Sequence, residues 1–357
     1  MEWTRGLVLG RGSSATVSTA TSTSGDVFAV KSVEFSKSQS LQKEQHFLSI
    51  LKSPYVVSYK GYDITNEENK MVYNIFIDYM SGGSIIDLIN RRNGRGLNNF
   101  ELANYTRQIV KGLEYIHSNG IVHCDIKGRN IMVQDGFVVK IGDFGCAKWA
   151  HQASHISGTP MFMAPEVARG EEQLFPADIW ALGCTVIEMA TGGSPWPNVD
   201  NPVSVLYRIA FSDEIPTIPD SISEQGRDFV SKCLIRDPKQ RWTVKQLVEH
   251  PFVQQQLDEN SKEICCEKIR TDSPTSILEQ DVWNWMEETS PSSSSSSSLS
   301  SSSVLWVGDD FGELKSLRQR IKQLAGKSEM PNWGCENEWM TIRNNGGGLG
   351  HEWRRRL

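Results

Sequence analysis

Two short stretches of the sequence place carboxylates and amides between apolar runs. HCDIKGRN spans residues 123–130 and contains Asp125 and Asn130, and IGDFGCAK spans residues 141–148 and contains Asp143. Asp125 can accept a proton, while Asn130 and Asp143 offer oxygen atoms, which are the ligands that the hard ion Mg2+ prefers. Together these side chains predict one proton acceptor beside a metal site.

A glycine-rich stretch near the N-terminus predicts a loop that can approach a polyphosphate. In GRGSSATV, Gly10 and Gly12 follow an expected strand and Val17 begins the next one, so no side chain separates the backbone from a phosphate. A dinucleotide-binding fold would need a third glycine and then a helix, but Ala15 stands there and a strand follows. Taken alone, the stretch favours a plain glycine-rich hairpin.

The next expected strand carries a lysine that could serve the same loop. In FAVKSV, Lys31 lies among alternating apolar residues, which directs its ammonium group toward the glycine-rich loop. Glu44 lies on the one helix expected in this part of the chain, where its carboxylate could pair with Lys31. Each residue on its own would be interpreted as a solvated surface charge.

Composition limits the class of protein. The chain has 357 residues, of which 38% are hydrophobic and 22% charged, and its net charge is -6. This acidic balance disfavours nucleic acid and membrane surfaces as partners, and we expect a cytoplasmic and/or nuclear protein because no signal peptide or membrane span is evident. The seven cysteines form no CxxC pair, so we expect reduced thiols and neither disulfides nor a zinc site.

The pattern of elements changes twice along the chain. Residues 1 to about 80 favour strands with one helix at residues 40–51, and residues from about 81 to 252 favour helices, such as the periodic stretch 101–120. Residues 253–357 contain a serine-rich tract that predicts a largely disordered, low-complexity tail. Two segments of the tail, around Trp283 and at 311–324, either bind partners such as regulators or pack back onto the folded part.

Taken together, residues 1–252 resemble the eukaryotic protein kinase family, with the motifs in the right order. Further matches are Ala164-Pro165-Glu166, Asp178 and Arg241, which are structural positions in that family. The resemblance implies an α+β fold with two lobes: a small antiparallel β-sheet lobe with one main helix, and a larger, mainly α-helical lobe. ATP and Mg2+ would bind in the cleft between the lobes.

The resemblance also implies a role for each motif residue. Asp125 would orient the attacking hydroxyl and accept its proton, Asn130 and Asp143 would hold the metal, and Lys31, paired with Glu44, would bind the nonreacting phosphates. Ile77 would guard the adenine pocket, Asp78 to Met80 would form the hinge that reads the adenine edge, and Val17, Ala29 and Met132 would sandwich the ring. The implied ATP-binding residues are Gly10, Arg11, Gly12, Ser13, Ser14, Ala15, Val17, Ala29, Lys31, Ile77, Asp78, Met80 and Met132.

Lys127 and Thr159 are the combination that accompanies serine or threonine acceptors in this family, and Lys127 would help to neutralise the transferred phosphoryl group. Within the family, IVHCDIKGRNIMV and SGTPMFMAPE resemble the plant MEKK-like MAP kinase kinase kinases. The implied substrate is a MAP kinase kinase in stress or hormone signalling. A Ser/Thr kinase with another protein substrate is the alternative. A pseudokinase scaffold is disfavoured because Lys31, Asp125, Asn130 and Asp143 are all present.

Cys124 departs from the family, whose members usually have arginine before the catalytic aspartate to pair with a phosphate on the activation segment, which ends at Glu166. Ser154, Ser157 and Thr159 could still be phosphorylated, but switching through this arginine is excluded. We therefore predict high basal activity that depends little on phosphate in this segment. The thiol of Cys124 is either a small apolar filler or, as the less favoured alternative, a redox-sensitive group.

Overall fold

The structure is a computed structural model that describes residues 2–12, 15–134, 137–152, 155–197, 199 and 201–254. The predicted serine-rich tail and its two candidate binding segments lie outside these residues. Two of the predicted ATP-binding residues, Ser13 and Ser14, also lie outside them.

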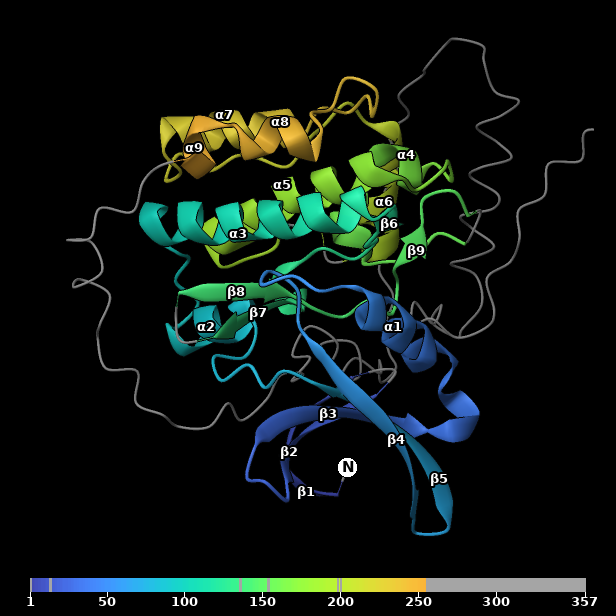
Figure 1. Cartoon of the computed structure of the whole chain (residues 1–357). Helices are drawn as coiled ribbons and strands as arrows, with labels where there is room; N and C mark the ends of the chain where they lie inside the picture. The colour runs from blue at the N-terminus through green and yellow to red at the C-terminus, as the bar shows by residue number, and fades with distance from the viewer. Residues whose placement is uncertain are drawn as a thin grey trace, which may run out of the picture.

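The N-terminal part is a five-stranded antiparallel sheet in the order β1-β2-β3-β5-β4 (Figure 1). Its strands are β1 (Trp3–Arg11), β2 (Thr16–Ser22), β3 (Val27–Glu34), β4 (Tyr59–Glu67) and β5 (Lys70–Ile77). On β5, residues 73–76 are all buried, and they include the large apolar side chains of Tyr73, Ile75 and Phe76. On β4 the burial alternates between half-buried and exposed residues, as expected for a strand with one face in solvent.

Apolar residues cover both faces of this sheet. On one face, Phe28 and Phe76 belong to a small cluster against which Trp3 packs. On the other face, Tyr73 and Ile75 join the main core, together with buried residues of α1 (Gln39–Ile50), which follows the short 3-10 helix η1 (Phe35–Lys37). The helix is therefore held against the sheet by its apolar side, and this fixes the position of Glu44.

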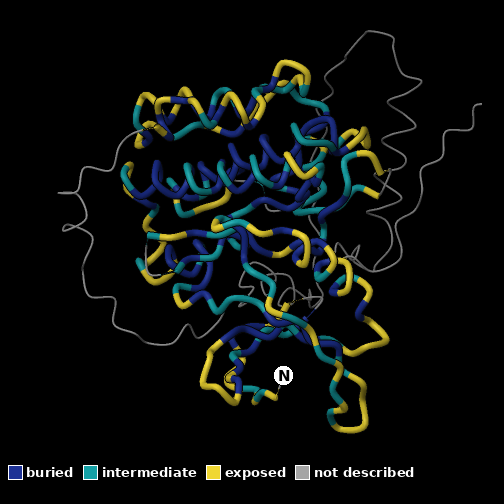
Figure 2. The backbone as a smooth tube through the Cα atoms, viewed as in Figure 1, coloured by how far each residue is buried: buried dark blue, intermediate teal, exposed yellow. Residues whose placement is uncertain are grey.

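The remainder of the described chain is mainly helical (Figure 1). Its elements are α2 (Ile85–Arg91), α3 (Asn99–Ser118), η2 (Gly128–Asn130), η3 (Pro160–Phe162), α4 (Pro165–Ala168), α5 (Phe175–Thr191), α6 (Pro202–Phe211), α7 (Glu224–Cys233), α8 (Val244–Val248) and α9 (Pro251–Gln254). Figure 2 shows that the buried positions concentrate in α3 and α5, while the exposed ones lie along the outer helices.

Local sequence signals explain where α3 begins and where α5 ends. Asn98 and Glu101 form a reciprocal capping box at the start of α3, which satisfies backbone N–H groups that have no partner inside the helix. Every residue of α5 from 177 to 187 is buried, so this mainly apolar helix is packed on all sides. It ends at Gly192, whose φ of 74° suits glycine.

Two pairs of short strands bring the polar stretches of the sequence together. β6 (Ile121–Val122) pairs with β9 (Lys148–Trp149), and β7 (Ile131–Gln134) pairs with β8 (Val138–Ile141). Residues 123–130 follow β6 and residues 142–147 follow β8, so both loops lie at the same place. The N–H of Gly142 donates to the carbonyl of Asn130 over 2.9 Å and joins the loops directly.

The expected α+β fold with two lobes is confirmed. Two boundaries differ from expectation. β1 continues through Arg11, so Gly10 lies in the strand opposite Val17, with a register shift before it, and not in a loop after the strand. The stretch VVSYKGY, residues 56–62, favours a strand by its sequence, but β4 begins at Tyr59 because residues 56 and 57 contact the β8 region instead. Among the described helices, none contains a stretch long and apolar enough to cross a membrane.

Candidate active site

Lys31 lies in a row of residues that crosses four strands. Gly10 is opposite Val17, Val17 is opposite Lys31, and Lys31 is opposite Ile75. The Lys31 ammonium is 2.7 Å from Oε2 of Glu44 and 3.1 Å from Oδ1 of Asp143. The structure therefore brings together three residues from β3, α1 and the loop after β8.

The electrostatics of this triad reflect burial and opposite charge. Burial acts to lower the pKa of Lys31, but Asp143 and Glu44 more than offset it and hold the lysine protonated. Partial loss of water around Asp143 acts to raise its pKa, but Lys31 and Lys127 lower it to about 2, so this carboxylate is ionised at neutral pH. For Glu44, burial prevails over Lys31 and raises the pKa to about 7.

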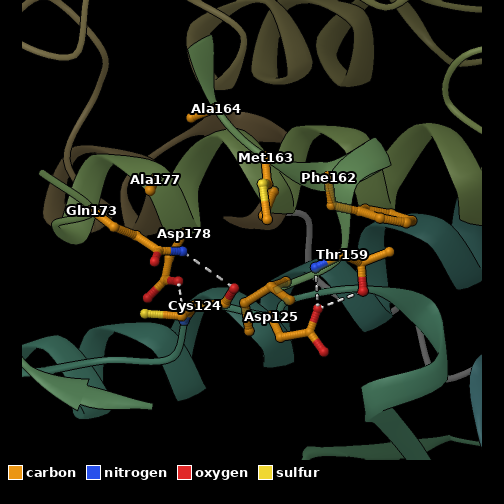
Figure 3. Close-up of a pocket in the computed structure, with 11 residues that line it drawn as sticks. Cys124, Asp125, Thr159, Phe162, Met163, Ala164, Gln173, Ala177 and Asp178 are labelled. Carbon is orange, nitrogen blue, oxygen red and sulfur yellow. Dashed lines mark hydrogen bonds between the residues drawn. The ribbon is translucent and has the colours of Figure 1, made fainter. Parts of the chain in front are cut away.

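The carboxylate of Asp125 is held by several hydrogen bonds. Its Oδ1 accepts from the N–H of Thr159 over 3.0 Å and from the Thr159 hydroxyl over 2.7 Å (Figure 3). Its Oδ2 accepts from the amide nitrogen of Asn130 over 3.0 Å and lies 2.9 Å from the Lys127 ammonium. Lys127 also donates to the Thr159 hydroxyl over 2.7 Å. The site thus places a hydroxyl against one carboxylate and one ammonium group.

Hydrogen bonds to α5 hold the backbone of the loop that carries Asp125. Asp178, in the first turn of α5, accepts the N–H of His123 over 2.8 Å. It also accepts the N–H of Cys124 over 2.9 Å (Figure 3). Cys124 has a φ of 69°, an uncommon conformation for a residue with a side chain, and this bond stabilises it. His123 contacts the carbonyl of Gly142 over 3.0 Å. Asp178 therefore sets the direction in which Asp125 points.

Asn130 and Asp143 fit a magnesium ion by the chemistry of their donor atoms. The amide nitrogen of Asn130 donates to the backbone carbonyl of Asp125 over 2.8 Å as well as to its carboxylate, which turns the amide oxygen the other way. The Asp143 side chain is 47% exposed, so part of its carboxylate is accessible. Mg2+ is usually bound by one or two such oxygen donors together with substrate phosphates. Within the described residues, no group of three or more His, Cys, Asp or Glu residues could hold a metal by itself.

The residues predicted to surround adenine come from both lobes. Ala29 is opposite Ile77, next to the pair Val17 and Lys31, so three predicted residues are neighbours on the sheet. Met132 comes from β7 of the helical lobe. Arg11 ends β1, and the N–H of Gly12 donates to the carbonyl of Ala15 over 2.8 Å. The ATP-binding roles of these residues stay predictions.

Asp78 and Met80 form the connection between the lobes. The carboxylate of Asp78 is paired with Lys140 at 2.7 Å and with Lys60 at 3.1 Å. Burial acts to raise its pKa, but Lys140 and the N–H of Ser58 lower it to about 2. The carboxylate of Asp78 is thus engaged by Lys140, Lys60 and the N–H of Ser58. This leaves the predicted adenine contact to its backbone.

The Cys124 thiol is buried beside α5, where burial and the charge of Asp178 raise its pKa well above the ordinary range. A thiol that stays protonated is a poor nucleophile, so the structure favours the filler over the redox alternative.

Two polar residues that support the catalytic loop, residues 123–130, were not predicted from the sequence. One oxygen of Glu188, on α5, accepts the N–H of Gly128 over 2.7 Å, although its position in an apolar helix suggested no such contact. Gln173 is buried and contacts both the loop and the activation segment. Its neighbours Glu171 and Glu172 are exposed, so the sequence around it resembles an ordinary polar surface turn.

Comparisons with known proteins agree with this geometry. Residues 3–253 match the protein kinase domain family. The chain is 48% identical to mitogen-activated protein kinase kinase kinase 18 of Arabidopsis thaliana over 81% of this chain and 86% of that protein. It is 47% identical to mitogen-activated protein kinase kinase kinase 17 of Arabidopsis thaliana over 81% of this chain and 78% of that protein. It is 34% identical to mitogen-activated protein kinase kinase kinase 20 of the same organism over 96% of this chain and 100% of that protein.

The chain therefore belongs to the protein kinase family. Within it, the chain is an ATP-dependent Ser/Thr kinase of the MAP kinase kinase kinase type. Protein kinases use ATP and a divalent metal ion, usually Mg2+.

Proposed function

We propose that this chain transfers the γ-phosphoryl group of ATP to Ser or Thr residues of MAP kinase kinases. The names of its relatives support this substrate class. The observation that carries the proposed chemistry is the contact between Asp125 and Thr159, because it shows an aliphatic hydroxyl donating to the carboxylate with the Lys127 ammonium beside it.

Each residue of the site has a role in this reaction. Asp125 orients the incoming hydroxyl and accepts its proton, and Lys127 stabilises the negative charge of the transferred group. Lys31 binds the nonreacting phosphates and is held in place by Glu44. Asn130 and Asp143 would hold Mg2+, which neutralises phosphate charge when bound. Catalysis is then a matter of positioning and of charge neutralisation.

The cellular setting is part of the proposal. The acidic composition supports a protein partner in place of nucleic acid. We place the kinase in the cytoplasm and/or nucleus, in a stress or hormone cascade, with regulators that bind residues 253–357. Fractionation of cells that express the tagged full chain would test the location, and recovery with membranes would contradict it.

The direct test uses a panel of MAP kinase kinases that have been inactivated by substitution of their own catalytic lysine. The purified chain should transfer label from ATP to Ser or Thr of at least one of them, and replacement of the acceptor residues by Ala should remove the label. An unrelated Ser/Thr-rich protein is the control for promiscuous transfer. Labelling of the control alone would favour the alternative, a Ser/Thr kinase with another protein substrate.

A further inference from the structure

Gln173 is a buried polar residue that lies between two functional segments. It belongs to the turn that joins α4 to α5, and its side chain is only 3% exposed. Together with Cys124, Asp125, Thr159 and Asp178 it lines a small pocket behind the site (Figure 3). A buried amide must be hydrogen-bonded to offset the loss of water, so its partners show what it holds together.

Those partners are the backbones of the activation segment and of the catalytic loop. The side-chain oxygen of Gln173 accepts the N–H of Ser157 over 3.2 Å, and its nitrogen donates to the carbonyl of Ser157 over 2.9 Å. The same nitrogen is 3.4 Å from the carbonyl oxygen of Cys124 and donates to it (Figure 3). One amide thus satisfies both backbone groups of Ser157 and joins that residue to the loop that carries Asp125.

The residues next to Ser157 continue the same contact. Gly158 has a φ of 113°, and a Cβ at this position would lie 2.2 Å from the Cys124 carbonyl oxygen, so the two backbones are in direct contact. Thr159 then donates twice to Asp125. A displacement of Ser157 would therefore be transmitted over two residues to the proton-accepting carboxylate.

Cys124 does not make this connection with its side chain. Its thiol is directed to the carbonyl of Val122, over 3.6 Å, and only its backbone carbonyl faces the activation segment. The contacts that hold Ser157 to Thr159 on the loop come from Gln173, from the Cys124 carbonyl and from Asp125.

We propose that Gln173 is a positioning residue that docks the unphosphorylated activation segment on the catalytic loop, in place of the arginine and phosphate contact that Cys124 precludes. This inference rests on the role proposed for Asp125. Through the contacts of Gln173 with Ser157 and Cys124, the chain reaches an active arrangement without a phosphate.

The experiment compares Gln173→Met and Gln173→Glu with the parent chain after exhaustive phosphatase treatment. Methionine has a similar length but no amide, so kcat should fall roughly tenfold, about the effect of losing one net hydrogen bond or a little more. The KM for ATP should stay within about twofold of the parent value, because Lys31, Glu44 and Asp143 do not contact Gln173. An unchanged kcat in Gln173→Met would overturn the proposal.

The Glu variant supplies a readout that a purely structural role would not change. An ionised carboxylate would face the carbonyls of Ser157 and Cys124 without a proton to donate, whereas a protonated one regains an O–H donor. The rate of Gln173→Glu relative to the parent should therefore rise severalfold as the pH falls from about 8 to about 6. A flat ratio would contradict the proposal even if Gln173→Met fails to fold.

Gln254→Glu is the matched control, because Gln254 is exposed at the end of α9 and the substitution makes the same change of charge. Its rate relative to the parent should not vary with pH. Rates are measured on any protein acceptor that the parent chain labels. Failure to label MAP kinase kinases would thus count against the proposed substrate alone, and the Gln173 comparison would still be decided.

Discussion

At the scale of single residues, the catalytic arrangement follows from a few short-range contacts. Asp125 and Asn130 are five positions apart, and the single turn of η2 between them returns the Asn130 amide to the Asp125 carboxylate and carbonyl. Residue types and spacing predicted a proton acceptor beside a metal site here, but not this hydrogen bond. The pairing of Lys31 with Glu44 was proposed from the order of the elements and made specific by the family resemblance, because it depends on how α1 packs on the sheet.

Cys124 leads to a prediction about regulation. Exhaustive phosphatase treatment should change kcat of the parent chain by less than about threefold, because a neutral, buried thiol cannot pair with a phosphate as arginine does. The measurement is the initial rate before and after treatment, with phosphorylation monitored by mass spectrometry. A complete collapse of activity on dephosphorylation would show that another cation reads a phosphate on this segment.

At the scale of elements, α5 is the support for the whole site. Its first turn holds the loop through Asp178, its last turns contact the loop through Glu188, and Trp180 packs under the Arg241 guanidinium at 5.2 Å. The apolar character of α5 predicted a buried helix. It could not predict which polar side chains face the loop, because that depends on the rotation of α5 relative to β6 and η2.

Glu166 and Arg241, two of the structural positions of the family, form a buried ion pair at 2.7 Å and join α4 to the segment before α8. Arg241→Met should lower the free energy of unfolding by about 3 to 5 kcal/mol, because the charge of Glu166 would be left buried without its partner. Chemical denaturation would measure the loss.

The control for the Arg241 variant is Arg169→Met, which breaks an ion pair with Glu171 at the surface and should cost less than about 1 kcal/mol. The double variant Glu166→Gln/Arg241→Met should be more stable than Arg241→Met alone. Equal losses for Arg241→Met and Arg169→Met would show that burial of the pair has no energetic consequence.

Glu188 predicts a pH dependence of stability. Burial raises its pKa to about 7, although the Gly128 N–H acts to lower it, so the folded chain binds this proton more tightly than the unfolded chain. The contribution of Glu188 to stability should therefore decline as the pH rises from about 4.5 to about 7 and then level off. Glu188→Gln keeps an acceptor for Gly128 and has no charge to bury.

Relative to the parent, Glu188→Gln should consequently gain on the order of 1 to 2 kcal/mol of unfolding free energy between about pH 5 and pH 8. Thermal denaturation at the two pH values measures the difference, and Glu249→Gln, at an exposed position, serves as the control. The same difference for both variants, or none for Glu188→Gln, would refute this explanation.

At the scale of the whole molecule, the described residues include all those to which catalytic roles are assigned, and the match to the protein kinase domain spans residues 3–253. The two-lobed fold was predictable because the change from strand to helix patterns near residue 80 is sharp. Gln173 was not predictable, because a glutamine in a polar turn is interpreted as exposed until the packing of α4 against α5 is known.

A chain that ends after Gln254 should fold and retain ATP-dependent phosphorylation of the acceptor used for the full chain. All the contacts of Lys31, Asp125 and Asp143 described above lie within residues 1–254. Comparison of kcat between the two forms is the measurement. A higher rate in the shortened chain would indicate an inhibitory tail, and an inactive but folded product would contradict the prediction that residues 1–252 suffice.

The central claim is that Lys31 and Asp143 position ATP and its metal ion so that Asp125 can direct a hydroxyl at the terminal phosphate. The most direct test is label transfer from ATP by the parent chain, Lys31→Met and Asp143→Ala, with circular dichroism to confirm that each is folded. We expect both variants to lose more than about 100-fold in rate. Folded variants that label protein as fast as the parent would contradict the account.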